Sequence, residues 1–497
     1  MTAPSDRTRF IVSLQIFSVI FVAIFFLHLP LLRLPFFWDE AGYYVPAAYD
    51  LAQNHALIPH TTLDTGHPPL SAAYLAMWFT LSGWKPAVAR TAMLLVAAFA
   101  LTNVFLLARR ITNTPVAVAS TIATAVYPVF FVQSSLVHAD LTAAAFTLWG
   151  IRAAVEQRRR QSVVAFSLAV LSKETALITP LALALWELFD RRSRPVKVRL
   201  SRSAVWLTPL LPLLGWFAYH HHVTGRIFGG AEFYQYNVNQ TLNPLRFVLA
   251  VALRLWGLLG AMNMLALTAA TAIAMSFPPI VDQDGERKRI AIPIQLQFGL
   301  IMLAHVVGFS LLGGALLNRY LLPAYPLVII IGMSTLHRRI YRWPWAAAGI
   351  IGLFVLALFF DPPYRFAPED NLRYRDFVQI HFSAARFLDR HERDATILTA
   401  WPAQDELTRP YLGYVSRPFS VVSLHDFTVE EIMKARQMPG QYQVAYLFST
   451  NYEAATWFRP ELCLSRECLR STTCHSSWRS TGPTSSFHLT FPAFQNG

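Results

Sequence analysis

Residues 10–32 read FIVSLQIFSVIFVAIFFLHLPLL, an apolar run that contains no Asp, Glu, Lys or Arg. A helix of this length, at about 1.5 Å per residue, crosses the roughly 30 Å hydrocarbon core of a bilayer. The run follows Arg7 and Arg9, is longer than the apolar region of a secretory signal peptide and lacks a small-residue cleavage site. We therefore predict a first transmembrane helix whose N-terminal end lies in the cytoplasm.

Similar apolar runs recur as far as residue 360. The chain of 497 residues is 54% hydrophobic and only 14% charged, which is too little charge for the surface of a soluble protein of this size. About eleven crossings are expected, and the fold class is an all-α polytopic membrane bundle. The predicted spans are residues 10–32, 87–108, 114–133, 139–156, 162–173, 175–189, 203–220, 248–276, 294–312, 320–337 and 344–360.

Short clusters of Lys and Arg separate these runs, and the positive-inside rule assigns them to the cytoplasm. They therefore explain the net charge of +13 without a nucleic-acid partner. An odd number of crossings places the C-terminus outside, and the short loops favour a multi-pass protein of a bacterial inner membrane, in contact with membrane lipids. The clusters lie at residues 7–9, 109–110, 158–160, 191–202, 287–289 and 338–342.

Two spans depart from single upright helices. The chain must leave and re-enter the cytoplasm within residues 161–190, so we expect two short helices that meet at Ser172-Lys173-Glu174-Thr175. Residues 248–276 are too long for one upright span, which predicts a tilted or broken helix.

The composition changes after Phe360, so we divide the chain into a membrane domain, 1–360, and an extracytoplasmic C-terminal domain, 361–497. Helical patterns at 377–388 and 429–436 alternate with strand patterns at 395–399, 419–422 and 444–448, which predicts a small α/β domain. A loop-rich tail is expected from about residue 465. The three cysteines, Cys463, Cys468 and Cys474, allow at most one disulfide, and whether any pair forms one stays open.

The first external loop, residues 33–86, carries Trp38-Asp39-Glu40, and its aromatic residues suit a membrane interface. Asp39 and Glu40 are expected at the mouth of the bundle. Taken alone, the pair fits equally well a cap on a helix that lies along the interface.

Counting crossings places other ionisable residues on the same side, where charge at membrane depth is costly and usually lines a site. Asp140 also fits a helix cap and Arg319 a side chain that reaches to the interface. Lys173 and Glu174, at the apex of two short helices, require partners or a charged ligand. Because Arg and Lys hold phosphate and a carboxylate can take a proton, the cluster predicts a site for a phosphate-bearing, membrane-embedded substrate. Its members are His138, Asp140, Lys173, Glu174, the triplet His220, His221 and His222, and Arg319.

These residues, in this order, resemble the GT-C membrane glycosyltransferases that use polyprenyl-phosphate sugars, in particular the aminoarabinose transferase, protein O-mannosyltransferase and rhizobial lipopolysaccharide glycosyltransferase groups. The resemblance covers about residues 10–340. Its motifs are Trp38-Asp39-Glu40 with Tyr43 and Tyr44, His67-Pro68-Pro69-Leu70, Arg90, His138-Ala139-Asp140, Ser172-Lys173 and Arg319-Tyr320-Leu321-Leu322-Pro323.

The resemblance implies roles for single residues. Asp39 is expected to be catalytic, and Lys173, Arg319 and Arg90 to bind the lipid phosphate. This chain departs from these families at two positions. It has His67 where they commonly have Lys, and Glu174 where they often have a neutral residue. Glu174 is expected to weaken phosphate binding or to pair with Lys173. The residues expected to line the substrate cavity are Tyr43, Tyr44, His67, Glu174 and Tyr320.

The implied reaction is inverting glycosyl transfer from a polyprenyl-phosphate-linked sugar to a glycan, lipid or protein acceptor, with Asp39 as general base. Glu40, His138 and Asp140 are expected to orient the acceptor. A divalent metal held by Glu40 and His221 stays open, but we expect no obligatory cofactor. The alternatives are a secondary transporter or lipid flippase, disfavoured because no inverted repeat is visible, and a catalytically silent GT-C relative that acts as a binding subunit.

Overall fold

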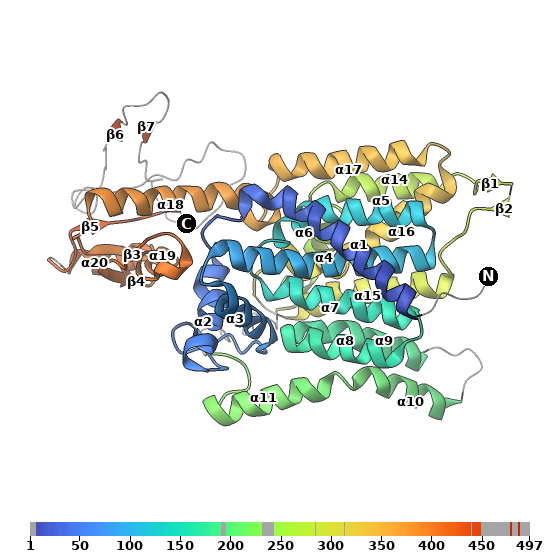
Figure 1. Cartoon of the computed structure of the whole chain (residues 1–497), viewed down its shortest axis with the longest axis horizontal. Helices are drawn as coiled ribbons and strands as arrows, with labels where there is room; N and C mark the ends of the chain where they lie inside the picture. The colour runs from blue at the N-terminus through green and yellow to red at the C-terminus, as the bar shows by residue number, and fades with distance from the viewer. Residues whose placement is uncertain are drawn as a thin grey trace.

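The computed structural model describes residues 6–189, 195–230, 243–283, 285–312, 314–438, 440–448, 478–479 and 486–487. Its larger part is a bundle of helices that lie roughly side by side, and the C-terminal elements sit at one end of that bundle (Figure 1). The bundle helices are α1 (Asp6–His28), α4 (Pro86–Ile111), α5 (Thr114–Val126), α6 (Pro128–Gln133), α7 (Ala139–Val155), α8 (Arg159–Ser172), α9 (Ile178–Phe189), α10 (Val196–Leu207), α11 (Leu210–Thr224), α13 (Pro244–Leu259), α14 (Met264–Met275), α15 (Ile292–Leu311), α16 (Tyr325–Arg339) and α17 (Trp343–Phe359).

Every predicted span contains at least one of these helices. Proline at the first or second helical position starts many of them, because its fixed φ suits the first turn and its missing N–H is not needed there. Three helices of the described chain are long and apolar enough to cross a membrane, at 11–31, 86–111 and 292–311, and a fourth crossing results if the bent pair α13 and α14 counts as one. The full number of crossings stays a prediction.

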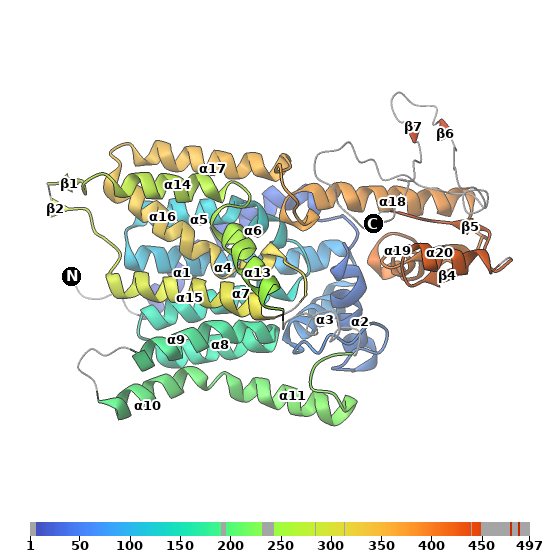
Figure 2. The same ribbon diagram turned by 180° about the vertical axis from the view of Figure 1, so that it is seen from behind.

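The two irregular spans have the expected form. α8 ends at Ser172, and a 3₁₀ turn, η3 (Glu174–Leu177), leads into α9, so the break falls at Lys173. α13 and α14 meet at 79°, and Met262 and Asn263 in the connection have positive φ. Seen from behind, α13 runs obliquely across its neighbours (Figure 2).

Small side chains pack the centre of the bundle. α4 and α7 bury alanines along their contact, which lets their backbones approach closely. On α7, a side chain at Gly150 would meet the Phe166 ring of α8 at 2.4 Å, so α8 lies directly on the α7 backbone. This packing fixes the ends of α7 and α8, where Asp140 and Lys173 are located.

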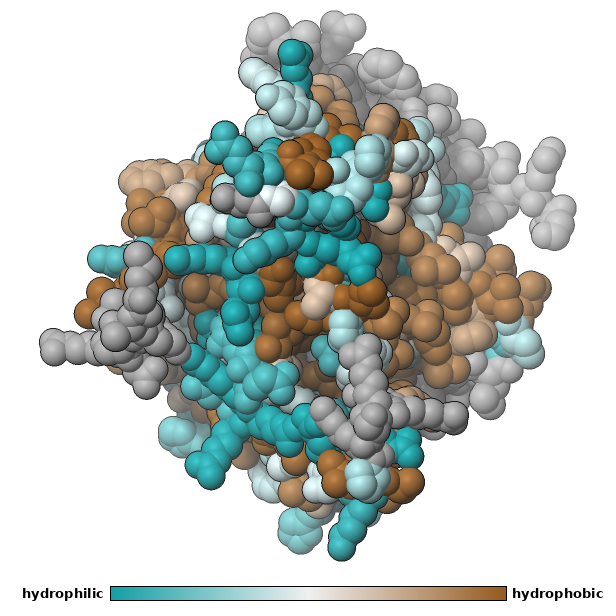
Figure 3. Space-filling model, turned by 90° about the vertical axis from the view of Figure 1, so that its right-hand side faces the viewer, coloured by the Kyte–Doolittle hydropathy of each residue, from teal (hydrophilic) through white to brown (hydrophobic). Residues whose placement is uncertain are grey.

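The first loop folds over one end of the bundle as a π-helical turn, η2 (Glu40–Tyr44), followed by α2 (Val45–Asn54) and α3 (Leu70–Ser82). The basic clusters between helices lie at the opposite end, beside the hairpin of β1 (Val281–Asp282) and β2 (Gly285–Glu286). Figure 3 looks onto that end and shows hydrophilic side chains gathered over it, whereas the flank at the right of the view is mostly hydrophobic.

The C-terminal segment contains a three-stranded parallel sheet in the order β4-β3-β5, with Ile397 of β3 paired to Val421 of β4. Helices and strands occupy the places that the sequence patterns predict, while the cysteines lie outside the described residues and the division into two domains stays a prediction. The elements are η5 (Pro368–Asp370), α18 (Arg373–His391), β3 (Ile397–Ala400), α19 (Ala403–Thr408), η6 (Pro410–Leu412), β4 (Val421–Leu424), α20 (Val429–Arg436), β5 (Val444–Ala445), β6 (Trp478–Arg479) and β7 (Ser486–Phe487).

This segment packs directly on the first loop. The Phe36 amide donates to the Leu412 carbonyl at 3.1 Å, and the Tyr414 hydroxyl donates to the Phe36 carbonyl at 2.9 Å. The rings of Trp38 and Trp401 lie edge to face with centroids 4.9 Å apart. The residues just before Asp39 are therefore held by the C-terminal segment.

Candidate active site

Arg319 is the centre of a buried charge cluster. It lies in a 3₁₀ turn, η4 (Asn318–Leu321), immediately before α16. One terminal nitrogen donates to Glu369 at 2.6 Å, the other donates to Asp39, and Nε lies 3.5 Å from Asp140. Three carboxylates from the first loop, the start of α7 and the segment after α17 therefore meet on one guanidinium.

Lys173 joins the same cluster from the break between α8 and α9. Its Nζ donates to Asp140 Oδ1 at 2.7 Å and lies 4.5 Å from the centroid of the Tyr320 ring. Asp140 therefore bridges the two cations. His138, and not Asp140, is the N-cap residue of α7, so the capping alternative for Asp140 is wrong.

Asp39 is the most accessible carboxylate of the cluster. Its side chain is 19% exposed, compared with 4% for Asp140 and 6% for Glu369. Trp38, the preceding residue, has a φ of 41°, an uncommon conformation for a bulky side chain. The Asp39 carboxylate is thus presented on an unusual turn, with one oxygen engaged by Arg319.

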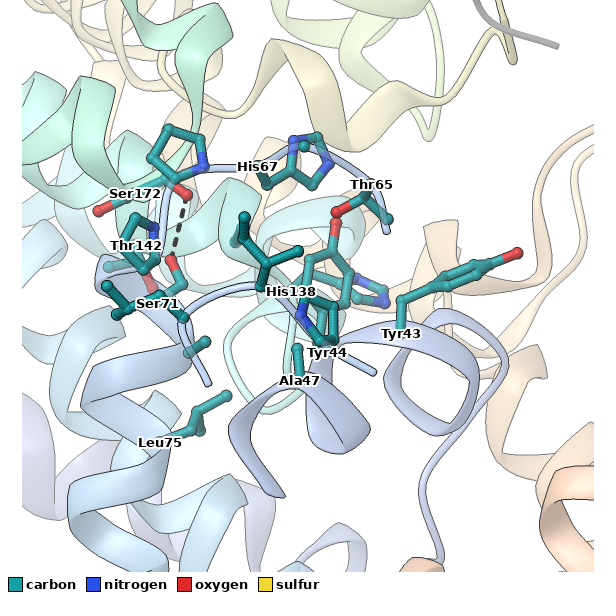
Figure 4. A pocket seen from close by; sticks show the side chains of 18 of the residues that line it. Tyr43, Tyr44, Ala47, Thr65, His67, Ser71, Leu75, His138, Thr142 and Ser172 are labelled. Carbon is teal, nitrogen blue, oxygen red and sulfur yellow. Dashed lines mark hydrogen bonds between the residues drawn. The ribbon is translucent and has the colours of Figure 1, made fainter. Parts of the chain in front are cut away.

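Glu174 does not pair with Lys173, because its Oε2 lies 2.8 Å from His67 Nδ1. The His67 ring lies parallel to that of Tyr44, with centroids 6.4 Å apart, and Tyr44 in turn contacts the ring of His138 at 5.6 Å. The first loop and the break between α8 and α9 are therefore tied together, and Figure 4 shows the cavity that they border. Among the predicted residues, the ones that line it are Tyr43, Tyr44, His67 and His138.

Glu40 and Arg90 form a separate, fully buried ion pair with Nη2 to Oε2 at 3.2 Å. All five N–H groups of Arg90 are used within the protein, and both oxygens of Glu40 accept two hydrogen bonds each. Arg90 thus has no donor left for a lipid phosphate, and Glu40 has no oxygen left for an acceptor or a metal. The geometry corrects both expectations and makes the pair structural. The backbone partners are the carbonyls of Leu34, Pro35 and Ser135 and the amides of Phe37 and Val137.

His221 lies exposed in the last turn of α11, while its neighbour His220 is buried and lies 3.0 Å from Asp64. In the part of the chain that the structure describes, no group of three or more His, Cys, Asp or Glu residues is arranged to hold a metal ion. The predicted combination of Glu40 with His221 therefore has no support in the geometry.

Glu369 was not among the residues expected in the site. Burial raises the pKa of Glu369 to about 8, against the opposing effect of Arg319, and burial likewise raises the pKa of Asp370 to about 7. The sequence signal was available, since Pro368-Glu369-Asp370 follows the last apolar run on the predicted external side. Only the fold shows that this turn returns to Arg319.

Part of the chain matches a known protein family. Residues 66–216, which contain His67, His138, Asp140 and Lys173, match the family described as dolichyl-phosphate-mannose-protein mannosyltransferase. No curated protein matches the chain in a sequence search.

Two solved structures of one protein share the fold. ArnT from Cupriavidus metallidurans in the apo state matches with a TM-score of 0.56 at 15% identity, covering 87% of this chain and 89% of that chain. The same protein bound to undecaprenyl phosphate matches with a TM-score of 0.55 at 15% identity, covering 88% and 89%. The Archaeoglobus fulgidus oligosaccharyltransferase in complex with Zn and sulfate gives a TM-score of 0.42 at 11% identity, covering 78% and 59%. The chain therefore shares a mostly helical fold with ArnT, and its predicted resemblance to the GT-C glycosyltransferases that use polyprenyl-phosphate sugars is confirmed.

Proposed function

We propose that this protein is an inverting glycosyltransferase that moves a sugar from a polyprenyl phosphate to a glycan, lipid or protein acceptor on the non-cytoplasmic side of the membrane. Asp39 acts as the general base. The observation that carries the proposal is the cluster itself. Asp39, the most accessible of its three carboxylates, pairs with the buried Arg319, and Asp140 links Arg319 to the second buried cation, Lys173.

In the proposed step, Asp39 takes the proton of an acceptor hydroxyl or amine as that atom bonds to the anomeric carbon. The bond between the anomeric carbon and the phosphate oxygen breaks on the opposite face, and its electron pair leaves with polyprenyl phosphate. Lys173 and Arg319 stabilise the charge that develops on the departing phosphate. His138 and Asp140 position the reacting groups.

A similarity supports the lipid-linked donor, and the distribution of charge supports the side of the membrane. One solved structure with the same fold has undecaprenyl phosphate bound. The basic clusters lie at the end of the bundle opposite the first loop, as expected if the site faces the non-cytoplasmic side.

The test is Asp39→Asn in purified protein, assayed for transfer from polyprenyl-phosphate sugars. A lost general base lowers the rate by about 10²- to 10⁴-fold, while donor binding should persist. Asp376→Asn, a matched change at an exposed position on α18, should leave transfer unchanged. Undiminished transfer by Asp39→Asn would remove Asp39 from the catalytic role.

The sugar and the acceptor require a separate experiment. Mass spectrometry of lipid-linked and surface glycans from cells that lack the protein should show which glycan loses a sugar. If no glycan changes and the purified protein moves a solute across vesicles while lipid-linked sugar stays intact, the transporter alternative replaces this proposal.

A further inference from the structure

Arg254 on α13 is a buried cation without a carboxylate partner among the described residues. Only 4% of the residue is exposed. One terminal nitrogen lies 3.5 Å from the Ala315 carbonyl, and Nε is buried without a hydrogen-bond partner. None of the ion pairs formed within the described ranges includes Arg254.

The other buried cations of this region are neutralised. Arg90 pairs with Glu40, Lys173 pairs with Asp140, and Arg319 contacts three carboxylates. Among the described residues, the side chains found against Arg254 are aromatic rings, Phe309 at 5.5 Å and Tyr320 at 5.7 Å from the guanidinium carbon to the ring centroid. Because a buried charge without a counter-ion is costly, such a residue is usually kept for an anionic ligand.

Arg254 also lies next to the charge cluster. The Tyr320 ring that it contacts is the ring over which Lys173 lies at 4.5 Å. Gly257, one turn further along α13, allows this proximity, since a side chain there would meet Asn318 at 2.5 Å and push α13 away from η4. The helix therefore holds Arg254 against the turn that carries Arg319.

The opposite face of α13 is apolar and exposed. This face suits contact with the hydrocarbon of a bilayer, so α13 carries a buried cation on one side and borders lipid on the other. The exposed side chains of α13 include Leu245, Val248, Leu249, Leu253 and Trp256.

We propose that Arg254 binds the phosphate of the polyprenyl lipid, as a third cation beside Lys173 and Arg319. The inference rests on the proposed function for the nature of the lipid. Lys173 and Arg319 are already balanced by carboxylates, so Arg254 supplies the positive charge that an added phosphate needs. Its guanidinium can donate two parallel hydrogen bonds to phosphate oxygens.

The test measures equilibrium binding of a polyprenyl phosphate, the unphosphorylated polyprenol and inorganic phosphate to the full-length protein in lipid nanodiscs. Arg254→Met should weaken polyprenyl phosphate binding by about 10- to 100-fold, the effect of losing charge-assisted hydrogen bonds. The affinity of Arg254→Lys for polyprenyl phosphate should lie between those of the wild type and Arg254→Met. The affinity for polyprenol should be the same in all three proteins. Arg199→Met, which removes an arginine bonded to a backbone carbonyl at the far end of the bundle, is the control and should bind normally.

Thermal unfolding of the lipid-free protein separates a ligand site from a structural one. If Arg254 serves to bind a ligand and does not stabilise the fold, Arg254→Met leaves the melting temperature unchanged or raises it. A lower melting temperature, or undiminished affinity of Arg254→Met for polyprenyl phosphate, overturns the inference. So does wild-type binding of inorganic phosphate as tight as that of the lipid.

The two proposals can fail separately. Normal lipid binding by Arg254→Met, together with sugar transfer that depends on Asp39, overturns only the role of Arg254. If the protein binds polyprenyl phosphate through Arg254 but transfers no sugar, only the proposed reaction is overturned.

Discussion

Arg90 and Arg319 are both buried, but they use their guanidinium groups differently. Every N–H group of Arg90 donates a hydrogen bond to Glu40 or to a backbone carbonyl. Arg319 instead lies among three carboxylates, of which Asp39 is partly exposed. A guanidinium whose N–H groups all have buried partners, such as that of Arg90, stabilises the fold. A guanidinium with a partly exposed partner, such as that of Arg319, can exchange this partner for a substrate. The residue type alone does not distinguish these roles, and the sequence therefore predicted phosphate binding for both.

The Glu40–Arg90 pair should be essential for stability. Arg90→Met leaves Glu40 buried without its partner and should lower the free energy of unfolding by about 3–5 kcal/mol. Arg90→Lys should also destabilise, because an ammonium cannot replace five donors in a fixed plane. Unfolding in detergent, followed by fluorescence, measures both. An Arg90→Lys protein of normal stability that had lost polyprenyl phosphate binding would restore the phosphate-binding role.

Glu369 should make stability depend on pH. The pKa of Glu369 is raised from its ordinary value of 4.5 to about 8, chiefly by burial. Between these values the folded protein holds a proton that the unfolded chain has released, so the contribution of this group to stability is full below pH 4.5 and is lost as the pH rises through 8.

Glu369→Gln should flatten that part of the profile, which unfolding measurements between pH 5 and 9 can follow. Glu430→Gln, at a side chain that is 81% exposed on α20, is the matched control. An unchanged pH profile in Glu369→Gln would contradict the assignment.

At the scale of elements, apolar length predicted the helices well. A bilayer requires about 20 apolar residues per helix and satisfied backbone hydrogen bonds, so the positions of helices, the short pair around Lys173 and the break in 248–276 follow from composition. The contacts between elements do not follow. Glu174 pairs with His67, 107 residues earlier, because the first loop folds back over the ends of α8 and α9.

Gly66 holds that returning loop in place. Its φ is 68°, and a Cβ there would lie 2.4 Å from the Gly229 amide nitrogen. Gly66→Ala should therefore cost both backbone strain and a displaced contact, about 2–4 kcal/mol together, and move His67 away from Glu174. Gly83 has a similar φ of 88°, but an added Cβ there would meet no atom within 4 Å. Gly83→Ala therefore measures the backbone strain alone and should lower the free energy of unfolding by only about 1–2 kcal/mol. Equal losses of stability in the two variants would show that the contact with Gly229 does not matter.

At the scale of the whole molecule, the C-terminal segment supports the loop that carries Asp39. The sequence predicted the helices and strands of this segment but not its contact with the site, which depends on tertiary packing between distant parts of the chain. The Trp401 ring closes on Trp38 and Tyr43 and leaves no room for a side chain at Gly42.

Trp401→Ala should loosen the first loop and displace Asp39 slightly. If this displacement raises the activation free energy of transfer by about 1.4 kcal/mol, the rate falls about tenfold. Donor affinity should stay within twofold, because Lys173, Arg254 and Arg319 come from other elements. Trp401→Phe, which keeps an aromatic ring, should recover most of the rate. A loss of donor affinity equal to the loss of rate would mean that the segment holds the lipid site instead.

The position of Glu369 has a consequence for biosynthesis. A chain made from its N-terminus has Asp39, Asp140, Lys173 and Arg319 in the membrane before the residues after α17 leave the ribosome. Until then Arg319 lacks one of its three carboxylates and the first loop lacks Trp401, Leu412 and Tyr414. The reacting groups of the proposed mechanism are therefore made first, and the contacts that hold Arg319 and the first loop in place are completed only when the residues after α17 have been made.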